Sequence, residues 1–415
     1  MRTVDKMSGY NVLLLGLGEQ GKATLYDLDN SDMVSDIVVA DAAPDLDEYI
    51  EEFSSDKVSS VHLDANDEEQ ISELMNDADI VVEALPPQFA FPMAKLASEN
   101  GVNMVSSMYL KNPAISDPEK IKAREDALDK IDDMAKDKDI TILQEFGFDP
   151  GIDLMMVNQA ISELDEVHEL YCYGAGFPEY EAADNPLKYK FTWSVEGLLH
   201  SYLRAGKVLE DGEVREIPED EMFKPENVHK LKLDELEEPI ECFPNGNALD
   251  YAETLGLDDE ENLKTLGRYT CRWQGHSDFW YPMAKCGFLD EEPIEVEGKK
   301  VSPIKFVENL LKPQDMFHLK EDERDVALIR VDARGVKDGE KIRNMYQLID
   351  KKDLETGFTA MQRNVGFTLS IGAQMILKGE IEGPGILTPL DVPLSDVSGM
   401  LEKRDINIDH WTVKE

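Results

Sequence analysis

The stretch YNVLLL–GLGEQG, residues 10–21, decides the fold of the first part of the chain. A short apolar run that ends at a glycine is typical of a strand buried on both faces of a parallel sheet. The next residues, 21–30, predict a helix. In such a unit Gly16 permits a tight turn, Gly18 lets the backbone approach a pyrophosphate, and Gly21 lets helix and strand pack closely. The stretch therefore predicts a dinucleotide at a helix N-terminus, held by residues 16 and 18–21, including Glu19 and Gln20.

Strand and helix signals alternate through the first 145 residues. Further strands are expected at 36–41, 61–63, 79–85, 103–106 and 140–144, and further helices at 68–77 and 88–100. Alternation of this kind predicts an α/β fold with a Rossmann-type, doubly wound parallel sheet.

The pattern changes after residue 145. Two strand-like runs, 326–331 and 342–349, flank Asp338-Gly339, which is a hairpin signal. A long amphipathic helix is expected at 359–378 and a short one at 392–404. We therefore expect a dinucleotide-binding domain at 1–145, an α+β catalytic domain with a mainly antiparallel sheet at 146–370, and a C-terminal segment, 371–415, that returns to the first domain.

Charge excludes several classes of partner. The chain has 87 acidic and 42 basic residues and a net charge of −45, so nucleic acid and anionic membrane surfaces would be repelled. The acidic residues are spread along the chain, which predicts a solvated acidic surface of the kind seen in salt-adapted proteins.

Cysteine usage and hydropathy indicate a cytoplasmic protein. Cys172, Cys242, Cys271 and Cys286 show no CxxC spacing, and we expect reduced, isolated thiols without a metal site. No apolar run approaches the ~20 residues of a membrane span. The first residues, MRTVDKMSGY, contain no apolar signal core.

Polar residues at strand ends extend the predicted cofactor site. Asp41 ends the second strand, where a carboxylate can accept hydrogen bonds from ribose hydroxyls and repel a 2′-phosphate. This favours NAD over NADP, although NADP is possible. Asp64, Leu85 and Ser106 follow the third, fourth and fifth strands, and ligands of open α/β sheets gather at this edge. Capping or plain turn roles remain the alternatives for these residues.

Candidate substrate residues follow the first domain. Phe148 and Asp149 lie in the turn FGFDPG, and Asp149 could exchange protons near the nicotinamide or cap a helix. Lys190 lies in NPLKYKFTWS, a cationic cluster in an acidic chain and a candidate carboxylate receptor. Arg272 suits bidentate carboxylate binding but could form a structural ion pair. His276 could be an acid or base, or a structural histidine.

Four motifs together resemble the saccharopine dehydrogenase family, including its lysine 6-dehydrogenase relatives. They are GLGEQG at 16–21, FDPGID at 148–153, NPLKYKFTWSVEG at 185–197 and RWQGH at 272–276. The resemblance implies a Rossmann domain, a catalytic domain with an antiparallel sheet, a homodimer, and an amino-acid substrate oxidised by NAD(P) at its CH–NH bond. It also implies substrate contacts from Asp149 and from Thr270 to Arg272, with Cys271 between them.

The chain departs from the glutamate-forming branch of that family at two places. An Arg is expected after a Pro-Asn pair, but Asn245 is followed by glycine. A Tyr expected after the fourth strand is replaced by Gln88, which follows Pro87. The missing Arg bears on the substrate, because the resemblance implies that it holds a carboxylate.

Four functions are consistent with these residues. A saccharopine dehydrogenase would form glutamate and the lysine semialdehyde, and a lysine 6-dehydrogenase would release ammonia instead. The third is an enzyme similar to carboxynorspermidine dehydrogenase, and the fourth is a non-catalytic NAD-binding sensor. Asp149 is the first candidate for the general base of the three enzymes, followed by His276 and Lys190.

Overall fold

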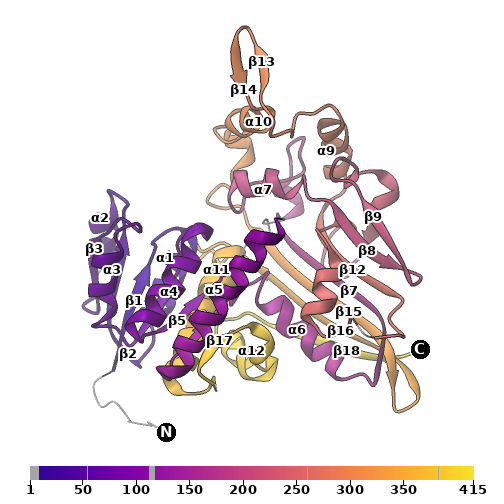
Figure 1. Ribbon diagram of the computed structural model, residues 1–415. Coiled ribbons are helices and arrows are strands. Elements are labelled where there is room, and N and C mark those ends of the chain that lie inside the picture. The colour runs from indigo at the N-terminus through magenta and orange to yellow at the C-terminus, as the bar shows by residue number, and fades with distance from the viewer. Residues whose placement is uncertain (1–8, 54, 112–116, 259, 382) are drawn as a thin grey trace. The chain divides into compact units, whose positions relative to one another are not determined.

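The computed structural model describes residues 9–53, 55–111, 117–258, 260–381 and 383–415, which form two compact units (Figure 1). Unit 1 comprises Met1–Met155 and Gln362–Asp405, and unit 2 comprises Met156–Met361 and Ile406–Glu415. The division at residues 145 and 370 stays a prediction. The N-terminal residues 1–8, which the signal-peptide prediction concerned, lie outside the described residues.

Unit 1 contains a seven-stranded sheet in the order β17-β6-β5-β4-β1-β2-β3, and every neighbouring pair is parallel. The strands are β1 (Tyr10–Leu15), β2 (Val34–Asp41), β3 (Val58–His62), β4 (Ile80–Glu83), β5 (Asn103–Ser106), β6 (Thr141–Leu143) and β17 (Gly385–Leu387). Reversal of strand order at β1 and β4 creates a switch point at the carboxyl edge, where ligands of such sheets bind.

Helices cover both faces of this sheet, which confirms the doubly wound α/β prediction. They are α1 (Glu19–Asp29), α2 (Leu46–Phe53), α3 (Glu68–Met75), α4 (Ala90–Asn100), α5 (Pro118–Asp137), α11 (Ala360–Lys378) and α12 (Leu394–Glu402). Apolar residues of α3, α4 and α5 pack with Leu13, Val81 and Met104 in one core cluster. On the other face α11 lies against α1, where Thr24 donates a 3.0 Å hydrogen bond to the Gly366 carbonyl.

Unit 2 contains a nine-stranded, mainly antiparallel sheet in the order β10-β11-β12-β7-β15-β16-β18, with β8 beside β12 and β9 beside β8. Its strands are β7 (Glu166–Pro178), β8 (Gly206–Glu210), β9 (Glu213–Ile217), β10 (His229–Leu231), β11 (Ile240–Pro244), β12 (Thr265–Trp273), β15 (Asp325–Lys337), β16 (Glu340–Lys351) and β18 (Ile408–Lys414). Strands β12 and β7 pair in parallel, and the other pairs run antiparallel. The predicted second sheet is confirmed.

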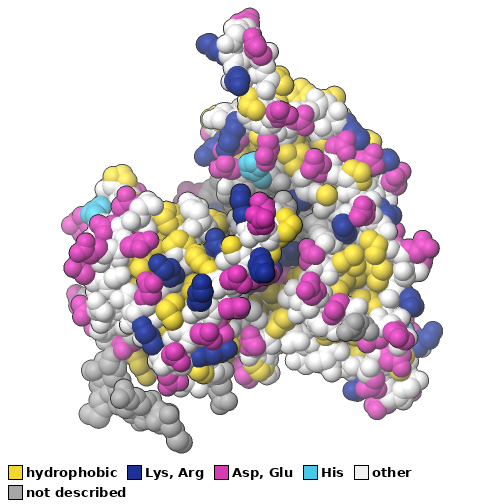
Figure 2. All heavy atoms as spheres, in the orientation of Figure 1, with side chains coloured by type: hydrophobic (Ala, Val, Ile, Leu, Met, Phe, Trp, Pro, Cys, Tyr) yellow, Lys and Arg dark blue, Asp and Glu magenta, His cyan; other side chains and the backbone are white. Residues whose placement is uncertain are grey.

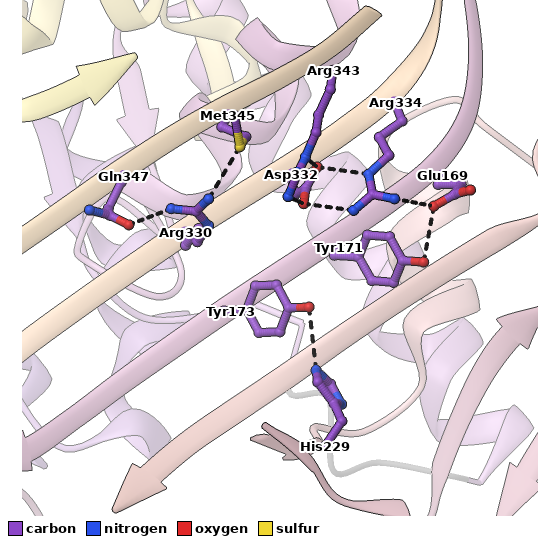
Figure 3. A network of polar contacts seen from close by, with 10 residues as sticks. All are labelled: Glu169, Tyr171, Tyr173, His229, Arg330, Asp332, Arg334, Arg343, Met345 and Gln347. Carbon is purple, nitrogen blue, oxygen red and sulfur yellow. Dashed lines mark hydrogen bonds and ion pairs between the residues drawn. The ribbon is translucent and has the colours of Figure 1, made fainter. Parts of the chain in front are cut away.

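The hairpin of β15 and β16 forms where Asp338-Gly339 predicted it. The φ angles of Asp338 and Gly339 are 53° and 78°, and positive φ at both central residues is typical of the two-residue turn that matches strand twist. Figure 3 shows polar side chains along this hairpin and β7, together with His229 of β10. Asp332 accepts hydrogen bonds from Arg334 and Arg343 there.

An aromatic core fills one part of unit 2. The helices of this unit are α6 (Ile152–Ser162, whose first turn lies in unit 1), α7 (Val195–Ser201), α8 (Ala248–Thr254), α9 (His276–Lys285) and α10 (Pro303–Leu311), and β13 (Ile294–Val296) and β14 (Lys299–Val301) form a separate hairpin. The largest fully buried side chains of this core are Trp273, Trp280, Tyr189 and Tyr202. These large side chains fix the positions of β12 and α9.

The surface agrees with the acidic composition. Figure 2 shows Asp and Glu side chains spread over the visible face with Lys and Arg between them. Within the described part of the chain, no helix combines the length and the apolar character needed to cross a bilayer.

Candidate functional site

The glycine turn between β1 and α1 has the geometry that a dinucleotide requires. Gly16 has φ of +95°, and a Cβ there would lie 2.6 Å from the Ala84 carbonyl oxygen. A Cβ on Gly21 would lie 2.1 Å from the Gly16 carbonyl oxygen, so both positions exclude a side chain. A Cβ on Gly18 would meet nothing within 4 Å. The turn is thus closed toward the protein and open at Gly18, which fits a pyrophosphate above the N-terminus of α1.

Two residues of the turn, Glu19 and Gln20, open helix α1. The Glu19 carboxylate accepts a 2.5 Å hydrogen bond from the Gln362 side chain on α11. The Gln20 side-chain oxygen is buried without a hydrogen-bond partner among the described residues. The amide of Gln20 is therefore a group that a ligand could satisfy.

The carboxylate of Asp41, at the end of β2, is tied to this turn. It accepts a 2.6 Å hydrogen bond from the Leu17 amide and a 2.7 Å hydrogen bond from the Ala43 amide. Asp64 follows β3 and accepts hydrogen bonds from the backbone and side chain of Asn66, which lower its pKa. Asp41 and the glycine turn therefore lie together, as predicted, whereas Asp64 forms a local turn.

The carboxyl group of Glu83, which was not predicted from the sequence as a site residue, is buried beside the glycine turn. Glu83, the last residue of β4, is fully buried and accepts hydrogen bonds of 2.5 Å from the Ser106 hydroxyl and 2.9 Å from the Leu85 amide. Burial raises the pKa of Glu83 to about 7, although these two hydrogen bonds oppose the shift. The signal available in the sequence was an acidic residue inside an apolar strand.

Glu83 brings together two of the predicted cofactor residues, Leu85 and Ser106. The Ser106 hydroxyl donates a hydrogen bond to Glu83 and accepts one from the Met108 amide at 3.0 Å. Both hydrogen bonds of this hydroxyl are therefore made within the protein. Pro87 and Gln88 lie exposed in the short 3-10 helix η1 (Pro87–Phe89).

The FGFDPG turn precedes α6. Phe148 is buried, Asp149 is half-buried, and the Asp149–Pro150 peptide bond is cis. Asp153 accepts a 2.8 Å hydrogen bond from the Gly151 amide and so closes the turn. Asp149 keeps partial access to solvent, which suits a proton acceptor.

Arg272 is a buried cation without a carboxylate partner among the described residues. Its side chain is 3% exposed, and its Nη1 donates a 2.8 Å hydrogen bond to the Cys271 carbonyl. Its guanidinium lies over the Tyr189 ring at 4.6 Å from the centroid, and its Nε has no hydrogen-bond partner in the described structure. A buried charge of this kind is costly unless a ligand or counter-ion pairs with it.

His276 opens α9 and is completely enclosed. One ring nitrogen lies 2.7 Å from the Leu187 carbonyl and the other lies 2.7 Å from the Tyr202 hydroxyl. Burial and the nearby Arg272 guanidinium lower the pKa of His276 to about 3. The carbonyl requires a proton on Nδ1, so the neutral ring accepts from Tyr202 through Nε2. His276 therefore links α9 to the predicted cationic segment as a neutral ring.

Lys190 is also buried, and it forms an ion pair. Its ammonium lies 2.5 Å from the Glu323 carboxylate and 4.0 Å from Asp184. Burial would raise the pKa of Glu323, but hydrogen bonds from Lys190 and Lys320 lower it to about 2.

The remaining predicted residues lie on β11, β12 and the segment that leaves β11. The Asn245 amide donates a 2.8 Å hydrogen bond to the Arg268 carbonyl, and Asn247 caps α8. Thr270 is half-buried, and Cys271 is buried. The prediction of isolated thiols is wrong for Cys242 and Cys271, because their sulfur atoms lie 2.8 Å apart.

Comparisons with known proteins match both parts of the chain. The model of the saccharopine dehydrogenase NADP binding domain matches residues 12–143, and the model of the saccharopine dehydrogenase C-terminal domain matches residues 147–406. An L-glutamate-forming, NADP(+)-linked saccharopine dehydrogenase of Saccharomyces cerevisiae is 23% identical over 94% of this chain and 95% of its own length. An alpha-aminoadipic semialdehyde synthase of Arabidopsis thaliana is 29% identical over 61% of this chain, which is 23% of that protein.

A solved structure has the same fold. The apo saccharopine dehydrogenase (L-Glu forming) from Saccharomyces cerevisiae matches with a TM-score of 0.81 and 22% identity, over 98% of this chain and 100% of that chain. Two family models together match most of the chain, and the glycine turn fits a dinucleotide. The chain belongs to the saccharopine dehydrogenase family and is an NAD(P)-dependent oxidoreductase that acts on CH–NH donors.

Proposed function

We propose that this protein oxidises a secondary amine that carries carboxylates, with saccharopine as the first candidate, or reduces the corresponding imine. The observation that carries this proposal is the Arg272 guanidinium, which is buried without a carboxylate partner in the described chain. A substrate carboxylate would supply the missing charge and the missing acceptor for Nε.

The glycine turn and Asp41 would hold the dinucleotide, and a bound nicotinamide would accept the hydride from the carbon of the CH–NH bond. We propose NAD as the preferred form, because a 2′-phosphate near the end of β2 would meet the Asp41 carboxylate. In this respect the protein would differ from its yeast relatives, which are named as NADP(+) enzymes.

Asp149 is our candidate for the general base that removes the amine proton and later activates water. Of the three candidates it is the one with partial exposure, since His276 is enclosed with both ring nitrogens engaged and Lys190 is ion-paired. Lys190 and His276 would then support the substrate segment indirectly. Oxidation of the CH–NH bond yields an imine, and its hydrolysis gives an amine and a semialdehyde.

A substrate panel tests the proposal. The purified protein would be incubated with NAD or NADP and with saccharopine, lysine or carboxynorspermidine, and reduced nicotinamide would be followed. Turnover of saccharopine, with lysine unreactive, is expected, and reaction with lysine alone would overturn the substrate. Binding of NAD without turnover of any amine would instead indicate a sensor.

A pair of variants tests the role of Arg272. Arg272→Lys keeps a charge but loses the planar fork, and should raise the KM for the amine about tenfold or more while leaving the KM for NAD unchanged. Arg215→Lys is the matched control, because Arg215 is ion-paired with Glu210 in the same unit. If both substitutions changed the KM for the amine equally, Arg272 would not be a substrate-binding residue.

A further inference from the structure

Two cysteines lie opposite each other on neighbouring strands in the core of unit 2. Cys242 on β11 and Cys271 on β12 are register partners in an antiparallel pair, and their sulfur atoms are 2.8 Å apart. Both side chains are completely buried. Directly opposite residues of antiparallel strands have Cα separations of roughly 4.5–5.5 Å, which lies within the range that disulfides span.

The surroundings of this pair are aromatic and hydrophobic. Tyr269, two residues before Cys271 on the same face of β12, stacks on Tyr173 of β7 with ring centroids 5.4 Å apart. The His229 ring packs edge-on against both tyrosines at 4.6 Å and 5.7 Å and receives the Tyr173 hydroxyl contact drawn in Figure 3. Burial raises the pKa of the Cys242 thiol, and the neighbouring Cys271 thiol raises it further.

We propose that Cys242 and Cys271 form a reversible disulfide that links β11 to β12. The polar partner of each thiol is the other thiol. Among the residues that the structure describes, no group of three or more His, Cys, Asp or Glu side chains could hold a metal ion here. A disulfide buries two sulfur atoms without leaving an S–H group in an apolar core. The link requires a further approach of less than about 1 Å, since bonded sulfur atoms lie about 2.05 Å apart.

A route to the pair exists at the edge of the sheet. Cys242 lies one strand in from β10, which is three residues long, and His229, the register partner of Cys242, is half-buried. Local opening of such a short edge strand costs less than opening of the central strands. A small oxidant could then enter from the β10 side.

The chemistry balances with a peroxide as the oxidant. When local opening exposes the first thiol to water and it loses its proton, the thiolate attacks hydrogen peroxide. An S–O bond forms as the O–O bond breaks, and the departing hydroxide takes up the proton and leaves as water. The second thiol then attacks the sulfenic sulfur, the S–S bond forms, and a second water leaves. The two sulfur atoms lose two electrons in total and the peroxide gains them, and a dithiol reductant reverses the change.

The link would enclose two residues that the sequence predicts to bind the substrate, and it would lie next to Arg272, on which the proposed function rests. The loop between Cys242 and Cys271 contains Asn245 and Thr270, and Arg272 directly follows the second cysteine. Formation of the bond does not depend on the proposed function, whereas its effect on the substrate does. The bond would fix the backbone of β12 at Cys271, the residue before Arg272. A several-fold change in the KM for the amine is therefore expected.

Mass spectrometry tests the bond independently of activity. A Cys286→Ser background removes the exposed thiol, and the full chain would be treated with hydrogen peroxide either when folded or during refolding. After quenching, it would be unfolded with an alkylating reagent and digested. A peptide joining Cys242 to Cys271 is expected, with Cys172 alone alkylated, and the same peptide must be absent in Cys271→Ser.

Two outcomes would overturn the proposal. One is alkylation of Cys172, Cys242 and Cys271 after both treatments, and the other is recovery of Cys242 or Cys271 as separate sulfinic acids. A linked protein with unaltered KM for the amine would overturn the effect on the substrate site. Failure of the wild-type protein to turn over any amine would count against the proposed function but not against the linked peptide.

Discussion

The Asp41 carboxylate accepts a 2.6 Å hydrogen bond from the amide of Leu17, the residue between the first two glycines of the turn. This contact joins the end of β2 to the loop that fits a pyrophosphate. One carboxylate thus shapes the phosphate loop and places negative charge where the adenosine ribose of a Rossmann cofactor lies.

Asp41→Ala should therefore weaken both the turn and the preference for NAD. The loss of two hydrogen bonds to a charged group should cost about 2–3 kcal/mol of unfolding free energy. The ratio of kcat/KM for NAD to that for NADP should fall at least about tenfold, because the 2′-phosphate no longer meets a carboxylate. Urea unfolding and initial rates with each cofactor measure these effects.

Asp32→Ala is a suitable control for Asp41→Ala, because Asp32 is exposed in the turn before β2. An unchanged cofactor ratio in Asp41→Ala, with stability lost, would show that Asp41 serves the turn alone.

Glu83 predicts a pH dependence of stability. Its pKa is raised from 4.5 to about 7 in the folded protein, so folding retains a proton that the unfolded chain releases between these values. The stabilisation is complete below pH 4.5 and is lost as the pH rises through 7, by roughly 3 kcal/mol. Glu83→Gln keeps the shape and cannot ionise, and should be more stable than the wild type at pH 8.

Urea unfolding at pH 5.5 and pH 8 measures this difference, with the exposed Glu73→Gln as the control. Parallel pH dependence in the wild type and Glu83→Gln would show that Glu83 is not the titrating group.

The sequence was sufficient to predict the elements that local pattern determines. The apolar run before Gly16 predicted a buried parallel strand, and Asp338-Gly339 predicted the hairpin turn, because both signals lie within a few residues. The contacts that decide the site are distant in sequence. Lys190 and Glu323 lie on separate connecting segments and meet only in the folded chain, whereas Cys242 meets Cys271 through the register of β11 and β12. Register follows from the whole hydrophobic pattern of both strands, which a local reading does not supply.

The same reason explains the reading of His276. The sequence left open whether His276 is an acid or base or a structural histidine, and enclosure by Leu187 and Tyr202 makes it a neutral, buried ring. Residues far apart in the sequence, among them Leu187, Tyr202 and Phe243, create that enclosure. The burial of His276, and the lowered pKa that follows from it, therefore cannot be predicted from the residues next to it in sequence.

His276→Gln should change acid stability. The folded pKa of about 3 lies below the usual 6.5, so the unfolded chain takes up a proton that the folded chain refuses. The wild type should lose stability as the pH falls from 6.5 toward 3, by up to roughly 5 kcal/mol, and this component should be absent in the variant. Unfolding at pH 7 and pH 4.5 measures it, and a catalytic pH profile that loses a limb near pH 6.5 in His276→Gln would contradict the assignment.

Asp332 links two arginines on the hairpin of unit 2 (Figure 3). Its side chain is 7% exposed and holds Arg343 at 2.5 Å and Arg334 at 3.2 Å, while Arg334 also reaches Glu169 at 3.2 Å. Burial would raise the pKa of Asp332, but the two guanidinium groups lower it. The carboxylate therefore stabilises the fold above its unfolded pKa, and this stabilisation is lost as the pH falls through the lowered folded value.

Asp332→Asn should destabilise the protein by about 3 kcal/mol, because two guanidinium groups lose their shared counter-ion. The cost lies at the low end for a buried pair, since both arginines are about one-third exposed and remain partly hydrated. Asp165→Asn, which removes an exposed ion pair with Lys337 on the same hairpin, is the matched control and should have little effect. Urea unfolding at low and high salt distinguishes the two, because salt screens the exposed pair far more than the enclosed one. Equal losses of unfolding free energy in both variants would show that the overall charge of this hairpin, and not the Asp332 ion pairs, determines its stability.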